Sequence, residues 1–211
     1  MLAGWLVAGS VWAAPTILVW GDSLSAGYGV DTRSGWVDLL ERKLRTQADA
    51  GLKNWIVING SVSGETTAGG LARLPAALAR HKPDVVLLEL GANDGLRGLD
   101  LKQMRVNLEK MIDLVTAIGA RPVLFEMRIP NNYGPLFTER FRRSFADTAS
   151  AKQATFMPFF LSSIAEDRPR WFQEDGIHPR TEAQPLILAT VWPQLAPMLK
   201  EVAASSVAPR P

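Results

Sequence analysis

Five short apolar runs alternate with longer amphipathic segments along this chain of 211 residues, and that alternation limits the possible folds more than any other feature. The runs have the length and the continuous apolar character of strands buried on both faces, and they cover residues 16–20, 55–58, 85–90, 122–127 and 155–161. The segments between them have apolar residues at helical spacing, and they cover residues 36–48, 70–81, 101–119 and 137–152. The clearest helical stripe consists of Leu101, Met104, Leu108, Met111, Ile112 and Val115.

Strands separated by helices of this length form right-handed crossovers, which produce a parallel sheet covered on both faces. The sequence therefore predicts an α/β fold, a three-layer α/β/α sandwich. A hydrophobic content of 47% is enough for one full core, so we expect a single domain over residues 14–202. The last helix is predicted to begin near Thr181, and residues 203–211 are expected to form a flexible C-terminal tail.

The first 13 residues are predicted to be a signal peptide, which would place the mature protein in the periplasm or outside the cell. They carry no charged side chain and end in Val11-Trp12-Ala13, so cleavage is expected after Ala13. The basic n-region is missing, so the signal is a partial one, and a buried helix or a disordered N-terminus is the alternative. No later segment has the apolar length of a transmembrane helix, so stable membrane insertion is not expected.

Charge and composition exclude several classes of function. The 23 basic and 21 acidic residues are interspersed, which is not the basic surface of a nucleic-acid-binding protein. The chain has no cysteine and only two histidines, His81 and His178, so thiol chemistry and a zinc site built from several histidines or cysteines are not possible. A carboxylate site for magnesium or calcium remains possible. We expect no metal and no cofactor.

A candidate nucleophile follows the first apolar run, in the motif Gly21-Asp22-Ser23-Leu24. Ligands bind beyond the carboxyl ends of strands in open α/β sheets, and Ser23 lies at such a point. If a helical turn follows, its free N–H groups favour a developing negative charge at the same place. The alternative is that Ser23 only caps a helix.

A candidate base and its carboxylate occur together in Glu174-Asp175-Gly176-Ile177-His178-Pro179. A serine hydroxyl needs an imidazole within hydrogen-bonding reach, and the imidazole needs a carboxylate on its other nitrogen. His178 and Asp175 could supply both from one loop. The alternative is a loop whose histidine is merely exposed.

Two further segments contain candidate oxyanion donors, one after the second run and one after the third. Gly64 could offer a backbone N–H, and Asn93 could offer a side-chain amide. One such donor typically contributes a factor of about 10²–10³ in rate. The alternatives are a turn glycine and a turn-capping asparagine.

These segments together resemble the GDSL, or SGNH, hydrolases over about residues 15–200. The matching blocks are Gly21-Asp22-Ser23-Leu24, Ser63-Gly64, Gly91-Ala92-Asn93-Asp94 and Asp175-Gly176-Ile177-His178-Pro179. Three further stretches are similar to the bacterial subgroup of thioesterase I, protease I or lysophospholipase L1, often called arylesterases: Gly70-Leu71-Ala72-Arg73-Leu74-Pro75, Asn93-Asp94-Gly95-Leu96-Arg97-Gly98 and Asn132-Tyr133-Gly134. No Gly-x-Ser-x-Gly motif surrounds Ser23, which argues against the larger α/β-hydrolase fold.

The resemblance implies the flavodoxin-like strand order 2-1-3-4-5 and a serine hydrolase that forms an acyl-enzyme. It implies Ser23, Asp175 and His178 as the triad, and Gly64, Asn93 and the Ser23 backbone N–H as oxyanion donors. The subgroup commonly has two glycines before the asparagine, whereas this chain has Ala92, whose methyl group could narrow the pocket. Asp22 and Asp94 are interpreted as structural.

The substrate is expected to be a small acyl ester or thioester. Asn132 and Tyr133 on one segment, and Trp171 and Phe172 on another, could wall an acyl groove, although plain packing explains such aromatics equally well. The resemblance implies short to medium acyl esters, aryl esters, acyl thioesters and lysophospholipids, without ranking them. The competing hypotheses are a carbohydrate O-deacetylase of the same superfamily and a non-catalytic flavodoxin-like binding module. We expect a monomer.

Overall fold

The structure, a computed structural model, describes residues 14–206, and its centre is a parallel sheet of five strands. The strands are β1 (Thr16–Gly21), β2 (Ile56–Asn59), β3 (Val85–Glu89), β4 (Arg121–Phe125) and β5 (Thr155–Met157). Their order across the sheet is β2-β1-β3-β4-β5, and every neighbouring pair runs parallel. The predicted three-layer sandwich and the strand order implied by the family resemblance are therefore confirmed.

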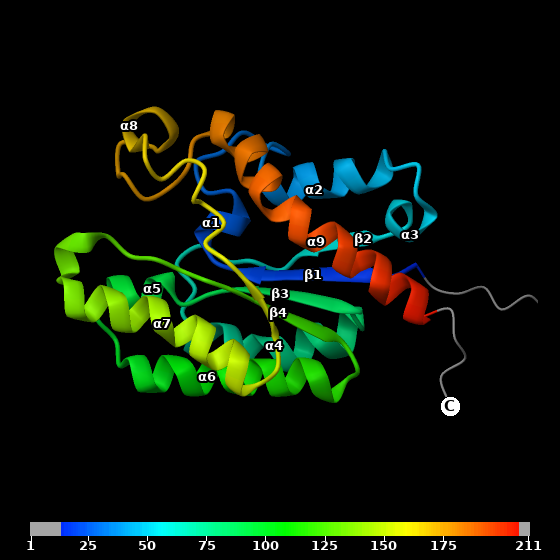
Figure 1. Ribbon diagram of the computed structural model, residues 1–211, viewed down its shortest axis with the longest axis horizontal. Helices are drawn as coiled ribbons and strands as arrows, with labels where there is room; N and C mark the ends of the chain where they lie inside the picture. The colour runs from blue at the N-terminus through cyan, green and yellow to red at the C-terminus, as the bar shows by residue number, and fades with distance from the viewer. Residues whose placement is uncertain (1–13, 207–211) are drawn as a thin grey trace, which may run out of the picture.

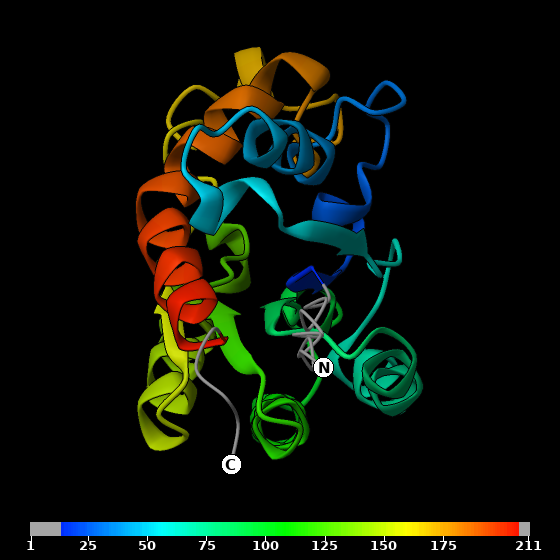
Figure 2. The ribbon, with the colours of Figure 1, turned by 90° about the vertical axis from the view of Figure 1, so that its right-hand side faces the viewer.

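Helices cover both faces of this sheet (Figures 1 and 2). One layer consists of α2 (Trp36–Arg45), α3 (Ala50–Lys53) and α9 (Gln184–Ser206), and the other of α4 (Thr67–His81), α6 (Leu101–Ala117) and α7 (Pro135–Ala151). Every residue of β1 and β3 is buried as a result. This explains why these strands read as continuous apolar runs rather than as alternating ones.

Helix α6 shows how the sequence pattern produces these layers. Asp100 caps its first turn, because its carboxylate accepts a hydrogen bond from the backbone N–H of Lys102 at 2.9 Å. The predicted apolar stripe faces inward, since Met104, Leu108, Met111, Ile112 and Val115 are all buried. The burial of this stripe holds the helix against the sheet and against its neighbours α4 and α7.

Several element ends differ from the predicted ones for local reasons. β5 stops at Met157 instead of residue 161, because Pro158 has no N–H to donate to the ladder. α4 begins before residue 70, because the Thr66 hydroxyl accepts a hydrogen bond from the backbone N–H of Gly69 at 3.3 Å and so caps an earlier turn.

The C-terminal prediction was partly wrong. A short 3-10 helix, η2 (Thr181–Ala183), stands where the last helix was expected to begin, and α9 follows it directly. α9 runs to Ser206, so residues 203–206 are helical rather than tail, and Val202 and Ala203 pack against the core. The predicted signal peptide at residues 1–13 and residues 207–211 of the predicted tail lie outside the described residues.

The carboxyl ends of the parallel strands meet at one edge of the sheet. Three short helices gather beyond this edge (Figure 1): α1 (Ser23–Ala26), α5 (Ala92–Leu96) and α8 (Arg168–Trp171). Ser23 lies on α1 and Asn93 on α5, and Asp175 and His178 follow α8. None of the helices within residues 14–206 has both the length and the apolar character needed to cross a membrane.

Candidate active site

The chain turns sharply between β1 and α1, and this turn carries Ser23. Asp22 caps α1, because its Oδ1 accepts a hydrogen bond from the backbone N–H of Leu24 at 3.0 Å. A Cβ atom at Gly21 would overlap the carboxyl group of Glu89, so only glycine fits at the end of β1. Since Asp22 supplies the cap, the hydroxyl of Ser23 is left for another partner.

That partner is His178, in the loop between α8 and η2. His178 Nε2 lies 2.8 Å from Ser23 Oγ, and His178 Nδ1 lies 2.6 Å from Asp175 Oδ2. The other oxygen of Asp175, Oδ1, accepts hydrogen bonds from the backbone N–H groups of Ile177 at 2.8 Å and His178 at 3.0 Å. In this arrangement the imidazole can take the hydroxyl proton while the carboxylate fixes its tautomer.

The carboxyl group of Asp175 is kept in its charged form. Burial acts to raise its pKa, but hydrogen bonds from the His178 side chain and from the backbone of His178 and Ile177 outweigh burial and lower the pKa below its usual value. An ionised carboxylate stabilises an imidazolium, as general-base catalysis requires.

Backbone hydrogen bonds close the loop that carries Asp175 and His178. Phe172 and Pro179 form an isolated antiparallel bridge, and the N–H of Gln173 donates to the carbonyl of His178 at 2.8 Å. Gly176 has a φ of 65°, which lets the loop turn between the two functional residues. The loop thus resembles a small hairpin laid against the sheet edge.

Tyr28 contacts this loop, and sequence reasoning missed it. Its ring lies 4.5 Å from the His178 ring, centroid to centroid, with 43° between the planes. The Tyr28 carbonyl accepts a hydrogen bond from Gln173 Nε2 at 2.9 Å, which ties the turn after α1 to the loop. No local pattern marks this tyrosine, because the contact joins residues distant in sequence.

The candidate oxyanion donors are connected through Asn93. Asn93 Nδ2 donates to Asp22 Oδ2 at 3.1 Å and to the carbonyl of Glu65 at 3.0 Å. Asp22 precedes Ser23 and Glu65 follows Gly64, so these two bonds bring all three donors to one place. Within residues 14–206, the backbone N–H groups of Ser23 and Gly64 have no hydrogen-bond acceptor and are available to a ligand.

Contacts with α7 and α4 hold helix α5, which carries Asn93, in place. Gly91 has a φ of 117°, which favours glycine, and its neighbour Phe145 leaves no room for a side chain. Asp94 is buried and accepts hydrogen bonds from the N–H and the hydroxyl of Thr67 at 2.8 and 2.5 Å. Asp94 thus joins α5 to α4, in agreement with its structural interpretation.

A further carboxyl group, that of Glu89, lies beneath the Ser23 turn. Glu89 is the last residue of β3 and is fully buried. Its Oε2 accepts hydrogen bonds from Ser25 Oγ at 2.6 Å and from the N–H of Asp22 at 3.4 Å. Burial raises the pKa of Glu89 well above its usual value, and burial also raises the pKa of Asp22 to about 6. The sequence signal was a glutamate inside an otherwise apolar run, which the sequence analysis did not use.

A cavity of about 370 Å³ is lined by chain neighbours of the candidate triad, although Ser23, Asp175 and His178 are not among its lining residues. Three of its residues are sequence neighbours of site residues: Leu24 follows Ser23, Ala92 precedes Asn93, and Ile177 precedes His178. The other lining residues are mostly apolar: Leu96, Met127, Arg128, Ile129, Pro130, Asn131, Phe159, Leu161, Ala165, Arg168 and Phe172. The size and lining suit an acyl chain. Ala92 lies in this wall, at the position where the family resemblance indicated a departure.

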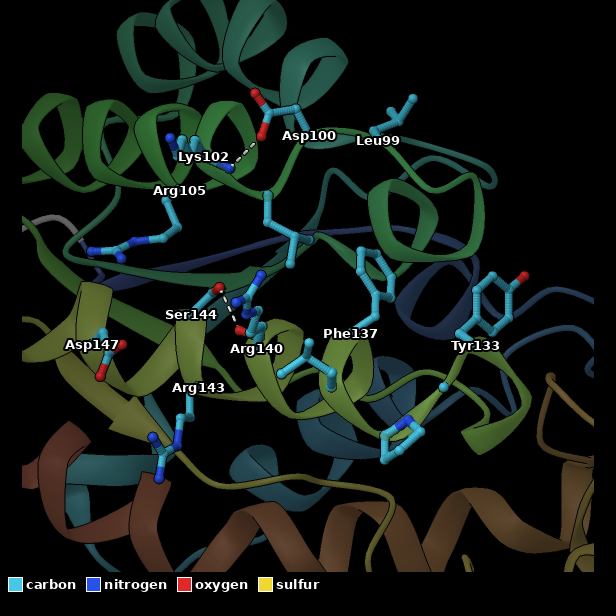
Figure 3. A pocket seen from close by; sticks show the side chains of 14 residues that line it. Leu99, Asp100, Lys102, Arg105, Tyr133, Phe137, Arg140, Arg143, Ser144 and Asp147 are labelled. Carbon is cyan, nitrogen blue, oxygen red and sulfur yellow. Dashed lines mark hydrogen bonds between the residues drawn. The ribbon is translucent and has the colours of Figure 1, made fainter.

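The four predicted substrate-binding residues are not all at this cavity. Phe172 lines it and is buried, whereas Asn132, Tyr133 and Trp171 are not among its lining residues. Tyr133 instead lies with Phe137 at one end of a separate groove of about 750 Å³, which is lined by the start of α6 and by α7 as far as Asp147 (Figure 3). One hydrogen bond joins the linings of the two cavities: the Tyr133 hydroxyl donates to the carbonyl of Leu96 at 2.8 Å.

The described residues 14–206 contain no group of three or more histidine, aspartate or glutamate side chains that could hold a metal ion.

Comparisons with known proteins agree on one family. Residues 19–184 match the model of the GDSL-like lipase/acylhydrolase family. The chain is 47% identical over 187 residues to esterase TesA of Pseudomonas aeruginosa, covering 89% of this chain and 90% of the relative. It is 41% identical over 187 residues to thioesterase 1/protease 1/lysophospholipase L1 of Escherichia coli, covering 89% of this chain and 86% of the relative. Among solved structures, the psychrotrophic esterase EstA from Pseudoalteromonas, inhibited by monoethylphosphonate, superposes with a TM-score of 0.81 at 42% identity, covering 87% of this chain and 98% of that one.

Proposed function

The chain belongs to the GDSL-like lipase/acylhydrolase family and hydrolyses ester bonds, and on that basis we propose that it cleaves carboxylic esters and acyl thioesters through an acyl-enzyme on Ser23. The observation that carries this proposal is the continuous chain of hydrogen bonds from Ser23 Oγ through His178 to Asp175.

In the first step, His178 Nε2 takes the proton of Ser23 as the hydroxyl oxygen attacks the acyl carbonyl carbon. Asp175 holds the proton on Nδ1, which leaves Nε2 free to accept, and it stabilises the imidazolium that forms. His178 then gives its proton to the departing alcohol or thiol. Water, activated by the same histidine, breaks the acyl–serine bond and releases the acid.

The negative charge of the tetrahedral intermediate falls on the former carbonyl oxygen. The free N–H groups of Ser23 and Gly64 support a binding site for this oxygen, together with the amide of Asn93. Both amide hydrogens of Asn93 already have acceptors, so one of these bonds has to be shared or released when the oxyanion forms.

The acyl chain is proposed to enter the cavity of about 370 Å³ beside Leu24, Ala92 and Ile177. Its mostly apolar lining favours short to medium acyl chains over an acetyl group on a carbohydrate, which has little apolar surface to bury. The names of the relatives, esterase and thioesterase 1/lysophospholipase L1, support aryl esters, acyl thioesters and lysophospholipids as candidate substrates.

We also propose a periplasmic or secreted monomer. The composition of residues 1–13 supports the location. All three proposed triad residues and the cavity come from a single chain, so the site does not need a second copy.

A fluorophosphonate probe tests the nucleophile. The wild-type protein is expected to be labelled on Ser23, and Ser23→Ala is expected to lose the label and nearly all ester turnover while its circular dichroism spectrum stays the same. Ser150→Ala, at an exposed position in the last turn of α7, serves as the matched control. Folded wild-type protein without label would instead favour the non-catalytic binding module.

A series of p-nitrophenyl esters from two to twelve carbons, measured beside acyl-CoA thioesters, tests the substrate class. A maximum of kcat/KM at short to medium chains is expected. Release of acetate from acetylated sugars without cleavage of the p-nitrophenyl esters would favour the carbohydrate O-deacetylase.

A further inference from the structure

The fully buried Glu89 has no role in the mechanism above, yet it lies directly beneath the nucleophile turn. Its Oε2 accepts hydrogen bonds from the Ser25 hydroxyl and from the N–H of Asp22, on either side of Ser23. Its Oε1 is buried and has no hydrogen-bond partner among the described residues. An ionised carboxylate with a bare buried oxygen is very costly, so the environment favours the neutral acid.

The second carboxyl group, that of Asp22, is also buried and acts electrostatically on Glu89. Two carboxyl groups in contact cannot both ionise without strong repulsion, and a shared site therefore retains one proton. The groups that act on Asp22 are Glu89 from β3, Asn93 from α5, the N–H of Leu24 from α1, and His178 from the loop before η2. Burial opposes charge on both groups, but both oxygens of Asp22 accept hydrogen bonds whereas Oε1 of Glu89 has no partner among the described residues, so the retained proton belongs on Glu89.

Asp22 is the member of the pair that contacts the proposed machinery. Its Oδ2 accepts the hydrogen bond from the Asn93 amide at 3.1 Å, and its Oδ1 holds the N–H of Leu24, the residue after Ser23. Hydrogen bonds to a charged acceptor are roughly twice as strong as neutral ones. The charge of Asp22 thus fixes both a candidate oxyanion donor and the nucleophile turn.

We propose that Asp22 and Glu89 form a buried carboxyl pair with a single negative charge, in which Glu89 is the neutral partner and Asp22 is a positioning residue for Asn93 and Ser23. This inference rests on the proposed function, because it assigns the pair a task in that site. It replaces the interpretation of Asp22 as purely structural.

The pair predicts a specific pH signature. Protonation of Asp22, whose pKa is raised to about 6 by burial, weakens its bond to the Asn93 amide. Asp22→Asn imitates this protonated form in charge and also places an amide group opposite Asn93. The kcat values of wild type and D22N are therefore expected to differ strongly when Asp22 is ionised and to become more similar as the pH falls through about 6.

The test measures kcat and KM for p-nitrophenyl butyrate from pH 5 to pH 8, with active sites counted by fluorophosphonate labelling. For D22N at pH 8 we expect kcat to fall by at least about tenfold, with KM within about threefold of wild type, because an oxyanion donor acts in the transition state. The ratio of wild-type to D22N kcat is expected to fall at least about threefold between pH 8 and pH 5, without reaching 1, because the introduced amide still faces an N–H donor. Glu89→Gln is expected to stay within about threefold of wild type throughout, because a neutral amide can replace a neutral acid.

Asp94→Asn is the matched control, since Asp94 is equally buried beside Asn93 but binds Thr67 instead. The ratio of wild-type to D94N kcat is expected to stay the same between pH 5 and pH 8, even if the substitution changes the stability of the fold. A D22N ratio that is equally independent of pH would overturn the positioning role. A loss in E89Q as large as that in D22N would overturn the neutral state of Glu89.

Failure of the proposed function gives a different result. In that case the wild type is not labelled at Ser23. If the wild type is labelled but the ratio of wild-type to D22N kcat does not change with pH, the proposed function stands and only the carboxyl pair is overturned.

Discussion

Replacing Asp175 by asparagine tests how the structure sets the tautomer of His178. Asp175 Oδ1 accepts two backbone hydrogen bonds, from Ile177 and His178 at 2.8 and 3.0 Å. The asparagine oxygen must take this position, because an NH₂ group there would face two N–H donors. Its NH₂ group then faces His178 Nδ1, which forces the ring proton onto Nε2, the nitrogen that has to accept the Ser23 proton.

The size of the effect follows from the same contacts. In a serine protease triad, this substitution lowers kcat by about 10⁴. The Asp175 side chain is 39% exposed, so water can compete with the asparagine and relieve part of the constraint. We therefore expect kcat/KM to fall by about 10³, which corresponds to about 4 kcal/mol of transition-state stabilisation.

The assay is p-nitrophenyl butyrate hydrolysis at pH 8, with the fold checked by circular dichroism. Glu174→Gln removes the adjacent exposed carboxylate and is expected to leave kcat/KM within about twofold of wild type. Asp175→Ala removes the carboxylate without imposing a tautomer, so it is expected to be less damaging than Asp175→Asn. The reasoning is refuted if D175N keeps more than a tenth of wild-type kcat/KM, or if the alanine variant is the slower of the two.

Three further predictions concern the surroundings of the triad. Ala92→Val narrows the acyl cavity, so the ratio of kcat/KM for octanoyl over butyryl esters is expected to fall about tenfold or more, at about 1–3 kcal/mol per excluded methylene; an unchanged ratio would place the chain elsewhere. Tyr28→Ala removes the ring packed on His178 and is expected to lower kcat about three- to tenfold, with Tyr28→Phe near wild type, since such aromatic pairs contribute about 0.5–1.5 kcal/mol. Because burial raises the pKa of Asp22, its contribution to the free energy of unfolding is present below pH 4 and is lost as the pH rises through about 6. In urea unfolding, the free energy of unfolding of D22N relative to that of wild type is therefore expected to rise by up to about 3 kcal/mol between pH 4 and pH 8. A difference that does not change with pH would contradict the raised pKa.

Local patterns were sufficient to predict the layers of the fold. The α6 stripe from Met104 to Val115 fixed both the helix and its buried face, because its period matches the helix itself. The ends of the helices and strands were harder to predict, since they depend on single residues rather than on the hydrophobic pattern. β5 ends before Pro158 although the apolar run continues, and α9 extends past the predicted domain end because Val202 packs against the core.

The candidate site divides in the same way. Ser23, Asp175 and His178 were predicted as the triad because a nucleophile, a base and a carboxylate occur in recognisable local motifs, and the structure brings the three side chains together. Tyr28 and Glu89 were missed, because their importance arises from contacts made across the sheet edge and under the turn, over long sequence separations. Glu89 could have been noticed as a carboxylate inside a buried strand, although its partner Asp22 could not have been assigned without the three-dimensional structure.

The hairpin-like loop that carries Asp175 and His178 can open while the rest of the fold stays intact, so activity can be lost without unfolding. Ser23 lies at the sheet edge, whereas the proposed base lies in a loop that is closed by backbone hydrogen bonds from Gln173 to His178 and from Arg180 to Trp171, and that Tyr28 contacts. Such a segment opens at a lower free energy than the five-stranded core. Warming is therefore expected to silence the enzyme reversibly at temperatures where the sheet is still intact, so its working range is governed by the opening of one loop rather than by global melting.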